Sequence, residues 1–154
     1  GLWGLQKGVW YRVREFYFNS REAQRQMTDE EYAGALAKLA GDGKITAVIV
    51  DPSAASFIEV LRRKGWRVRK ADNDVLTGIR LTSDALKEGR IVICEGCNDC
   101  IREMDEYVWD LSSGAKDRVK KEHDHAMDDM RYFVSTVLGK KKTGFAVCSV
   151  ERKS

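Results

Sequence analysis

The sequence lacks the long apolar runs, the strong charge of one sign and the repeats that would assign it to a special class. No apolar run approaches the ~20 residues that a membrane-spanning helix needs, and no secretory signal pattern opens the chain. The net charge of +3 permits a nucleic-acid partner without indicating one. With 154 residues, 43% hydrophobic and 33% charged, the chain is expected to form one ordinary globular domain with a real core.

Cysteine is scarce, and its pattern does not match a complete metal site. Cys94, Cys97 and Cys100 follow CxxCxxC spacing, and Cys148 lies far along the chain. A structural zinc site usually takes its four ligands from two separated pairs, and neither histidine has finger spacing. Without a secretory signal, reduced thiols in a cytosolic setting are expected. Packing on a short helix is the favoured interpretation, and a zinc-dependent nucleic-acid binder that uses these cysteines is the alternative.

One short, unbroken apolar run ends directly in a carboxylate. Five of the residues 45–50 are apolar and the sixth, Thr46, is polar and β-branched, a composition typical of a strand buried on both faces. Pro52, the only proline, cannot donate to a sheet ladder, so the strand is expected to end there. Asp51 is therefore predicted at the carboxyl edge of a central strand, where ligand sites form in open α/β sheets. The alternative is that Asp51 only caps or turns into the helix that follows.

The remaining pattern predicts an α/β fold around that strand. Residues 1–19 are expected to form a hairpin whose second strand covers 9–18, followed by a loop over 20–27. Thr28 and Glu31 form a capping-box pattern for a helix that ends near Gly41. A helix after Pro52 and a strand over 66–71 complete a strand–helix–strand unit with parallel strands. Three later helices are expected, one from 75 to about 88, one over 97–107 and one over 123–138. Two later strands are expected over 90–94 and 145–150.

The last predicted helix opens with several acids and a histidine. His125 and Asp128 are three residues apart, so their side chains can point at one spot. A helix dipole favours acids at this end, which makes a solvated acidic helix start one interpretation. A divalent cation is the other, because magnesium and manganese prefer carboxylate ligands. If Asp51 faces Asp128, the arrangement is that of a two-metal phosphodiester hydrolase.

Six short segments occur in an order and spacing that together are specific. They are Phe16 to Glu22, Gln26 to Tyr32, Val50 to Ala54, Lys70 to Val75, Tyr107 to Asp110 and, as the nearest match, Asp124-His125-Ala126-Met127-Asp128-Asp129-Met130-Arg131-Tyr132. Over about residues 8–138 the chain resembles the nuclease domain of the large terminase subunit of tailed bacteriophages. The resemblance implies an α/β, RNase H-like fold with a mixed central sheet and flanking helices. It implies a nuclease domain over 1–139, followed by a basic tail over 140–154.

The resemblance also implies an activity and roles for single residues. It implies a two-metal endonuclease that uses Mg²⁺ or Mn²⁺ to cut concatemeric double-stranded viral DNA in the host bacterial cytoplasm. Asp51 resembles the family's second metal-binding carboxylate, Asp128 the third, and His125 a histidine beside the metals. Asp124 and Asp129 are given no ligand role. The implied partners are double-stranded DNA, the terminase ATPase domain, the small terminase subunit and the portal, with no membrane partner.

Two parts of the family pattern are not found in this sequence. The first catalytic Asp of the family lies on a strand ahead of residues 2–5, and no glycine-rich phosphate loop with Lys-Ser/Thr occurs. We therefore expect a fragment of a longer gene product or a truncated prophage remnant, with weak metal binding and poor cutting. An inactive remnant that only binds DNA or a packaging partner is the alternative. A missing strand also predicts an unpaired sheet edge that favours association with another copy.

Basic residues just ahead of the acidic helix are the candidate DNA contacts. Lysine and arginine neutralise phosphates without sequence preference. A basic loop in this position could hold a strand over the metals; its members are Lys116, Arg118, Lys120 and Lys121. A second basic cluster is expected to be a solvated surface; its members are Arg62, Arg63, Lys64, Arg67, Arg69 and Lys70.

Overall fold

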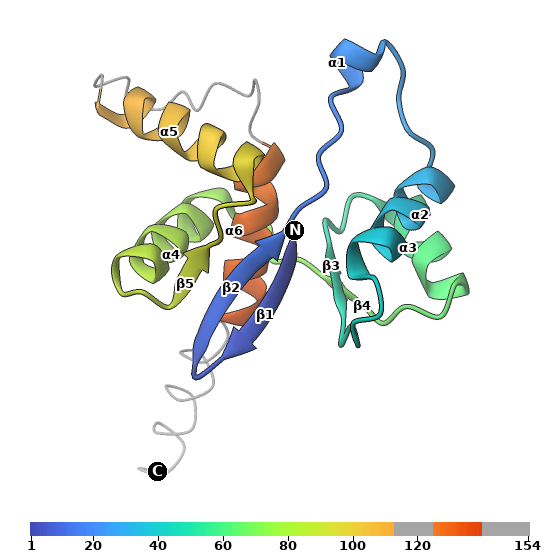
Figure 1. The fold of residues 1–154 in the computed structure, drawn as a ribbon, viewed down its shortest axis with the longest axis horizontal. Helices are drawn as coiled ribbons and strands as arrows, with labels where there is room; N and C mark the ends of the chain where they lie inside the picture. The colour runs from blue at the N-terminus through green and yellow to red at the C-terminus, as the bar shows by residue number, and fades with distance from the viewer. Residues whose placement is uncertain (113–124, 140–154) are drawn as a thin grey trace, which may run out of the picture.

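The computed structural model describes residues 1–112 and 125–139 (Figure 1). Its elements are β1 (Leu2–Gln6), β2 (Val9–Arg14), α1 (Ser20–Ala23), α2 (Asp29–Ala40), β3 (Val48–Val50), α3 (Ala55–Arg63), β4 (Val68–Lys70), α4 (Val75–Lys87), β5 (Ile91–Ile93), α5 (Asn98–Ser112) and α6 (His125–Val137). Within these ranges no helix has the length and apolar content that crossing a membrane requires. The predicted basic loop, basic tail and final strand lie outside the described residues.

The strands confirm the predicted α/β fold with a mixed sheet and flanking helices. β1 and β2 form an antiparallel hairpin, and β2 pairs in parallel with β5. The hairpin turn uses Lys7 and Gly8, both with positive φ, which matches the right-handed twist of the paired strands. β3 and β4 form a separate parallel pair, as the strand–helix–strand pattern predicts.

β1 and β3 each have a hydrogen-bonded strand on one side only, within the part of the chain that the structure describes. β3 is therefore not a central strand among these residues, unlike the prediction for the apolar run before Asp51. In Figure 1 the two strands lie between the group α2, α3, β4 and the group β2, β5, α4, α5, and α6 passes behind β1 and β2. The site described below lies between β1 and β3.

Several predicted boundaries are wrong, for identifiable reasons. The second strand stops at Arg14 because Glu15 leaves the ladder, and its carboxylate accepts the backbone N–H of Asp99 at 2.7 Å. The apolar run forms a strand only from Val48, where pairing with β4 starts. Residues expected as a loop form the short helix α1 because the Asn19 side chain caps it. By contrast, Thr28 and Glu31 make both hydrogen bonds of the predicted capping box.

Two hydrophobic cores hold the elements together. The first packs α6 against α4, α5 and β5, and its buried members are Ala85, Ile91, Cys97, Cys100, Ala126, Met130, Phe133 and Val134. The second packs α2 and α3 on β3 and β4, and its buried members are Ala33, Val50, Ile58, Val60 and Leu61. Cys97 and Cys100 are fully buried in the first core, and the Cys97 thiol donates to the carbonyl of Arg12. This is the packing role that their spacing favours.

Candidate active site

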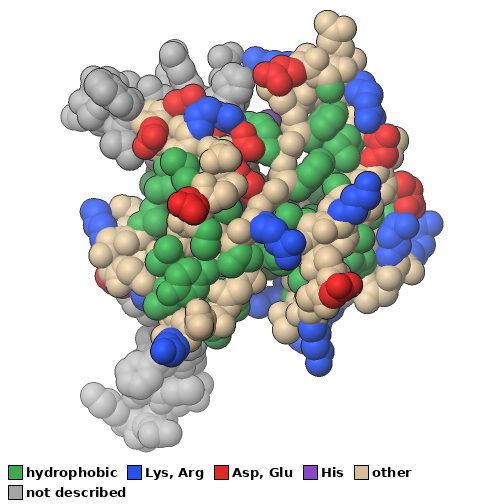
Figure 2. Space-filling model, in the orientation of Figure 1, with side chains coloured by type: hydrophobic (Ala, Val, Ile, Leu, Met, Phe, Trp, Pro, Cys, Tyr) green, Lys and Arg blue, Asp and Glu red, His purple; other side chains and the backbone are tan. Residues whose placement is uncertain are grey.

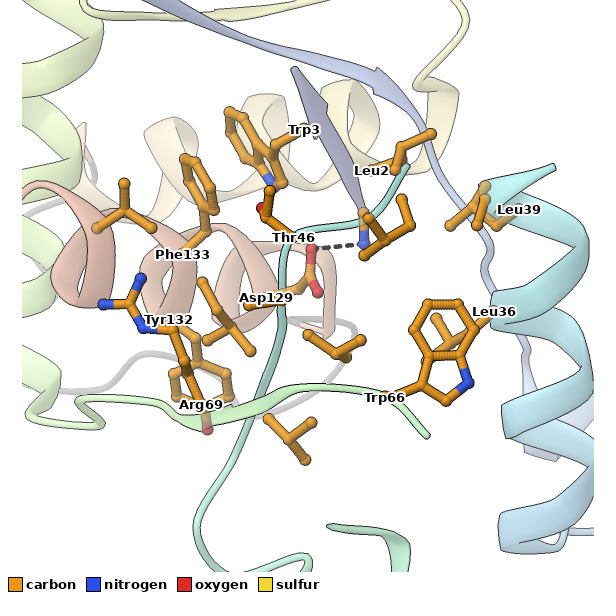
Figure 3. A pocket seen from close by; sticks show the side chains of 18 of the residues that line it. Leu2, Trp3, Leu36, Leu39, Thr46, Trp66, Arg69, Asp129, Tyr132 and Phe133 are labelled. Atoms are coloured by element: carbon orange, nitrogen blue, oxygen red, sulfur yellow. Dashed lines mark hydrogen bonds and ion pairs between the residues drawn. The ribbon is translucent and has the colours of Figure 1, made fainter. Parts of the chain in front are cut away.

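A cavity of about 590 Å³ lies between β1, β3, α2 and α6. One wall is apolar, with Leu36 and Leu39 from α2 beside Trp66, and α6 forms the opposite wall with Tyr132 and Phe133 (Figure 3). The acidic candidates Asp51 and Asp128 both line this cavity, and so does His125. The structure thus brings together three residues that the sequence places on two distant segments.

Asp51 lies where β3 ends, as predicted, but it does not cap the following helix. α3 begins at Ala55, and its N-cap Ala54 offers no side-chain hydrogen bond. Asp51 instead accepts the backbone N–H of Ser53 at 2.9 Å and the Tyr132 hydroxyl at 2.9 Å, one bond on each oxygen. The Ser53 N–H is the main cause of a lowered pKa of Asp51; burial opposes it, and Tyr132 and Arg131 add to it. Asp51 is therefore a carboxylate at neutral pH.

Asp128 forms an ion pair with its neighbour one turn along α6. An Arg131 nitrogen lies 2.7 Å from Asp128 Oδ1, and the Asp128 side chain is 40% exposed. Arg131 also donates to the carbonyl of Asn73 at 3.3 Å, and its guanidinium lies 4.9 Å from the centre of the Tyr132 ring. The Arg131 guanidinium is thus held by three contacts, beside the Asp128 carboxylate that lines the cavity.

Tyr132 connects α6, the helix that carries Asp128, to Asp51 at the end of β3. It follows Asp128 by four residues on α6, so both side chains lie on one face of the helix, and its hydroxyl reaches Asp51 on β3. Burial, the hydrogen bond to Asp51 and the charges of Asp128 and Asp51 raise the pKa of Tyr132 to about 12. Tyr132 therefore remains a protonated donor. Sequence reasoning gave no role to Arg131 or Tyr132, although both belong to the segment of strongest family resemblance.

The start of α6 is fixed by a carboxylate from another helix. Glu103 on α5 accepts the backbone N–H groups of Ala126 at 2.8 Å and Met127 at 3.0 Å. Its other oxygen accepts the hydroxyl of Tyr17 at 3.0 Å, and the residue is only 2% exposed. This cap sets the position of His125, whose ring centre lies 6.3 Å from that of Tyr17. The helical pattern of α5 gave no signal for it, because two of the three partners of Glu103 are backbone groups.

Asp129 has a structural partner. Its carboxylate pairs with Arg12 on β2, a side chain that is 2% exposed. Arg12 also lies 3.2 Å from Glu15, so the buried guanidinium is shared between two carboxylates. This ion pair joins α6 to β2, although Asp129 also lines the cavity. That Asp129 has no ligand role stays a prediction. Asp124 lies outside the described residues.

Comparison with known proteins identifies the family. Residues 9–136 match the model of the terminase RNaseH-like domain. The chain belongs to this family. The large terminase subunit of Escherichia phage T5 is 24% identical over 133 residues, which cover 82% of this chain and 30% of that protein. A large terminase from a thermophilic bacteriophage, solved in complex with ADP, is 46% identical with a TM-score of 0.82.

The similarity extends over most of this chain but over a minor part of each relative. The comparison with the ADP complex covers 90% of this chain and 36% of the thermophilic phage protein. A further crystal form of that protein gives 41% identity, a TM-score of 0.77, and coverage of 88% and 35%. The chain therefore spans about a third of the length of these large terminases. The mixed sheet with flanking helices matches their RNase H-like part.

The donor set of this terminase domain fits a hard divalent cation only in part. Each oxygen of Asp51 accepts one hydrogen bond, and Asp128 Oδ2 accepts none from the described residues. Since a carboxylate offers about four lone-pair positions, both retain acceptor capacity for Mg²⁺ or Mn²⁺. No group of three His, Cys, Asp or Glu residues is placed to hold an ion among the residues described. The third aspartate that lines the cavity, Asp129, is engaged by Arg12, and the two that remain are fewer than a two-metal site needs.

The candidate DNA contacts divide into two sets. Lys116, Arg118, Lys120 and Lys121 lie outside the described residues. In the second cluster Arg69 differs from its neighbours, because it lines the cavity and donates to the carbonyl of Thr136 at 3.2 Å. The others are exposed, as the solvated-surface interpretation predicts. Figure 2 shows lysine and arginine side chains scattered over both halves of one face instead of gathered in one patch.

Proposed function

We propose that this chain is the metal-dependent endonuclease domain of a phage DNA-packaging terminase, which hydrolyses phosphodiester bonds of concatemeric double-stranded DNA. One observation supports this most strongly: Asp51 and Asp128 line the same cavity in a chain of the terminase RNaseH-like family. Carboxylates that share a cavity can share a cation, whereas an acidic helix start that faced solvent could not. Tyr132, which follows Asp128 by four residues on α6, donates to Asp51 and so holds this part of α6 against the end of β3.

Each residue has a defined task in this proposal. Asp51 and Asp128 would hold Mg²⁺ or Mn²⁺ through the oxygens that face the cavity. When bound, such cations lower the pKa of a water and stabilise charge on the departing oxygen. His125, exposed at the start of α6, would accept a proton or steady a ligand. Tyr132 would keep the Asp51 carboxylate in a fixed orientation through its hydroxyl hydrogen bond. Its pKa of about 12 means that the hydroxyl stays protonated and can donate at neutral pH.

A third carboxylate is part of the proposal. The family resemblance implies an Asp on a strand ahead of residue 2. We assign that strand to the cavity, because β1 and β3 both line it and each lacks a second partner among the described residues. An inserted strand would join the two sheets and bring its acid beside Asp51. DNA, an ATPase domain, a small subunit, a portal and action in the host bacterial cytoplasm are proposals for the whole protein.

The first prediction concerns DNA nicking by the 154-residue chain. Supercoiled plasmid is expected to be nicked slowly in Mn²⁺, and Asp51→Asn or Asp128→Asn to lower the rate at least about tenfold, because each removes a ligand charge without changing size. Asp105→Asn, on the exposed side of α5, is the matched control and should cut like the parent chain. Circular dichroism checks that all variants are folded.

Two results would contradict the proposed function. Parental nicking rates in both Asp51→Asn and Asp128→Asn would remove these residues from the site. No nicking together with no Mn²⁺ binding by the folded chain would favour the remnant that only binds DNA or a partner.

A further inference from the structure

A buried cation lies against one of the two site carboxylates. Arg131 is 7% exposed, and its guanidinium lies 2.7 Å from Asp128 Oδ1. The ion pair therefore fixes a positive charge directly beside one of the two proposed metal ligands.

The packing around Arg131 prevents the guanidinium from moving aside. α4 carries Gly78 where α6 crosses it, and a Cβ at this position would lie 2.5 Å from Arg131 Cγ and 2.8 Å from Cδ. The aliphatic stem of Arg131 therefore lies directly on the backbone of α4. The head of the side chain donates to Asn73 and stacks on the Tyr132 ring. A side chain held at its stem and at its head keeps its charge in place.

We propose that Arg131 is an internal counter-ion that competes with a divalent cation for Asp128 and so keeps metal binding by this domain weak. The inference rests on the proposed function, because it takes Asp51 and Asp128 as the metal ligands. Arg131 neutralises one of the two negative charges that these acids supply. It also occupies one oxygen of Asp128 and leaves Oδ2 to the cation.

The size of the effect follows from Coulomb's law. Charges of +2 and +1 held about 5–6 Å apart at the dielectric constant of water repel by an energy that corresponds to roughly a tenfold change in affinity. Removing the positive charge should therefore tighten metal binding by about that factor. A less polar environment would make the change larger.

The counter-ion gives metal binding a dependence on other negative charges. With Arg131 in place, the two acids alone hold a cation poorly, and a third carboxylate or a DNA phosphate would restore the missing charge. Metal and nucleic acid would then each strengthen the binding of the other, because coupling between two ligands is reciprocal. The domain would carry its metals chiefly when DNA is present.

The test is direct Mn²⁺ binding to the 154-residue chain without DNA, measured by the loss of the free-ion electron paramagnetic resonance signal. Arg131→Met keeps the stem that packs on Gly78 and removes the charge, so we expect binding about tenfold tighter than in the parent. Arg131→Lys keeps the charge and should bind like the parent. Arg63→Met, on exposed α3, makes the same change in net charge away from the site. Arg131→Gln replaces the methionine variant if that one does not fold.

Each outcome decides the inference. Tighter binding in the folded neutral variant, but not in Arg131→Lys or Arg63→Met, supports it. Equal binding in the neutral variant overturns it, and so does weaker binding, which would mean that Arg131 orients Asp128 for the metal. Asp128→Asn distinguishes the two proposals: if this variant binds Mn²⁺ like the parent, the proposed function fails, whereas if it loses binding and Arg131→Met gains none, only the counter-ion fails.

Discussion

At the scale of single residues, the pKa values of two carboxyl groups, Glu103 and Asp51, are shifted in opposite directions by their surroundings. Burial is the largest effect at Glu103 and raises its pKa, although three hydrogen bonds favour the charged form. At Asp51 the Ser53 N–H is the largest effect and lowers the pKa. Ionisation of Glu103 therefore lowers the stability of the fold, whereas ionisation of Asp51 raises it.

The sign of this linkage predicts how Glu103 affects stability against pH. Since its folded pKa is raised, the native state holds the proton longer than the unfolded state, and stability falls as pH rises from the unfolded pKa through the folded one. Relative to Glu103→Gln, the parent should therefore lose stability as pH rises above about 4.5, whereas the Asp51 contribution is lost as pH falls below about 4. Urea unfolding at several pH values measures both, with Glu106→Gln as a control for charge on α5. If the parent chain instead became more stable relative to Glu103→Gln as pH rises above about 4.5, the argument that burial raises the pKa of Glu103 would be contradicted.

At the scale of elements, the crossing of α4 and α6 depends on a missing side chain. Gly78 is buried in α4, and an added Cβ would meet both Arg131 and the Ser135 hydroxyl oxygen, the latter at 2.9 Å. Both contacts are closer than packed atoms allow, so one helix would have to shift. Because α6 carries Asp128 and Tyr132, such a shift would also move the site.

Gly78→Ala is therefore expected to destabilise the chain by about 1–3 kcal/mol, because overcrowding outweighs the better helix propensity of alanine. Gly34→Ala is the matched control: Gly34 lies in α2 with nothing within 4 Å of the added Cβ, so the same change should stabilise by roughly 0.5–1 kcal/mol. Urea unfolding gives both values. A gain of stability at both positions would show that α4 and α6 are not tightly packed.

Local signals in the sequence were enough for most elements and for placing Asp51 at the end of a strand. The hairpin, the capping box at Thr28 and the strand that ends at Asp51 follow from neighbours in sequence, and the structure has all three. The contacts of Glu15, Glu103 and Tyr132 could not be predicted in this way. Each joins a side chain to a backbone group or carboxylate more than 20 residues away, and no periodic pattern encodes such a partner.

At the scale of the whole molecule, β1 lies at the end of its sheet and carries an exposed apolar side chain. Leu5 on this strand is 57% exposed, and the strand pairs only with β2 among the described residues. An open strand edge with an apolar residue favours pairing with another copy.

We expect the chain to self-associate as its concentration rises, and Leu5→Lys to reduce this, because a lysine on an edge strand opposes further pairing. Leu76→Lys is the matched control, since Leu76 is 81% exposed but lies on α4 and not on a strand. Sedimentation velocity over a range of concentrations measures the species. A chain that stays monomeric, or an equal effect of both substitutions, would exclude association through the β1 edge.

The two cores and the cavity meet on a single helix. One face of α6 supplies Met130 and Val134 to the first core, and the other supplies Asp128 and Tyr132 to the cavity. Even Arg131, between these faces, is seated on the backbone of α4. A substitution on α6 that alters the packing of the first core would therefore also displace the side chains that α6 contributes to the cavity.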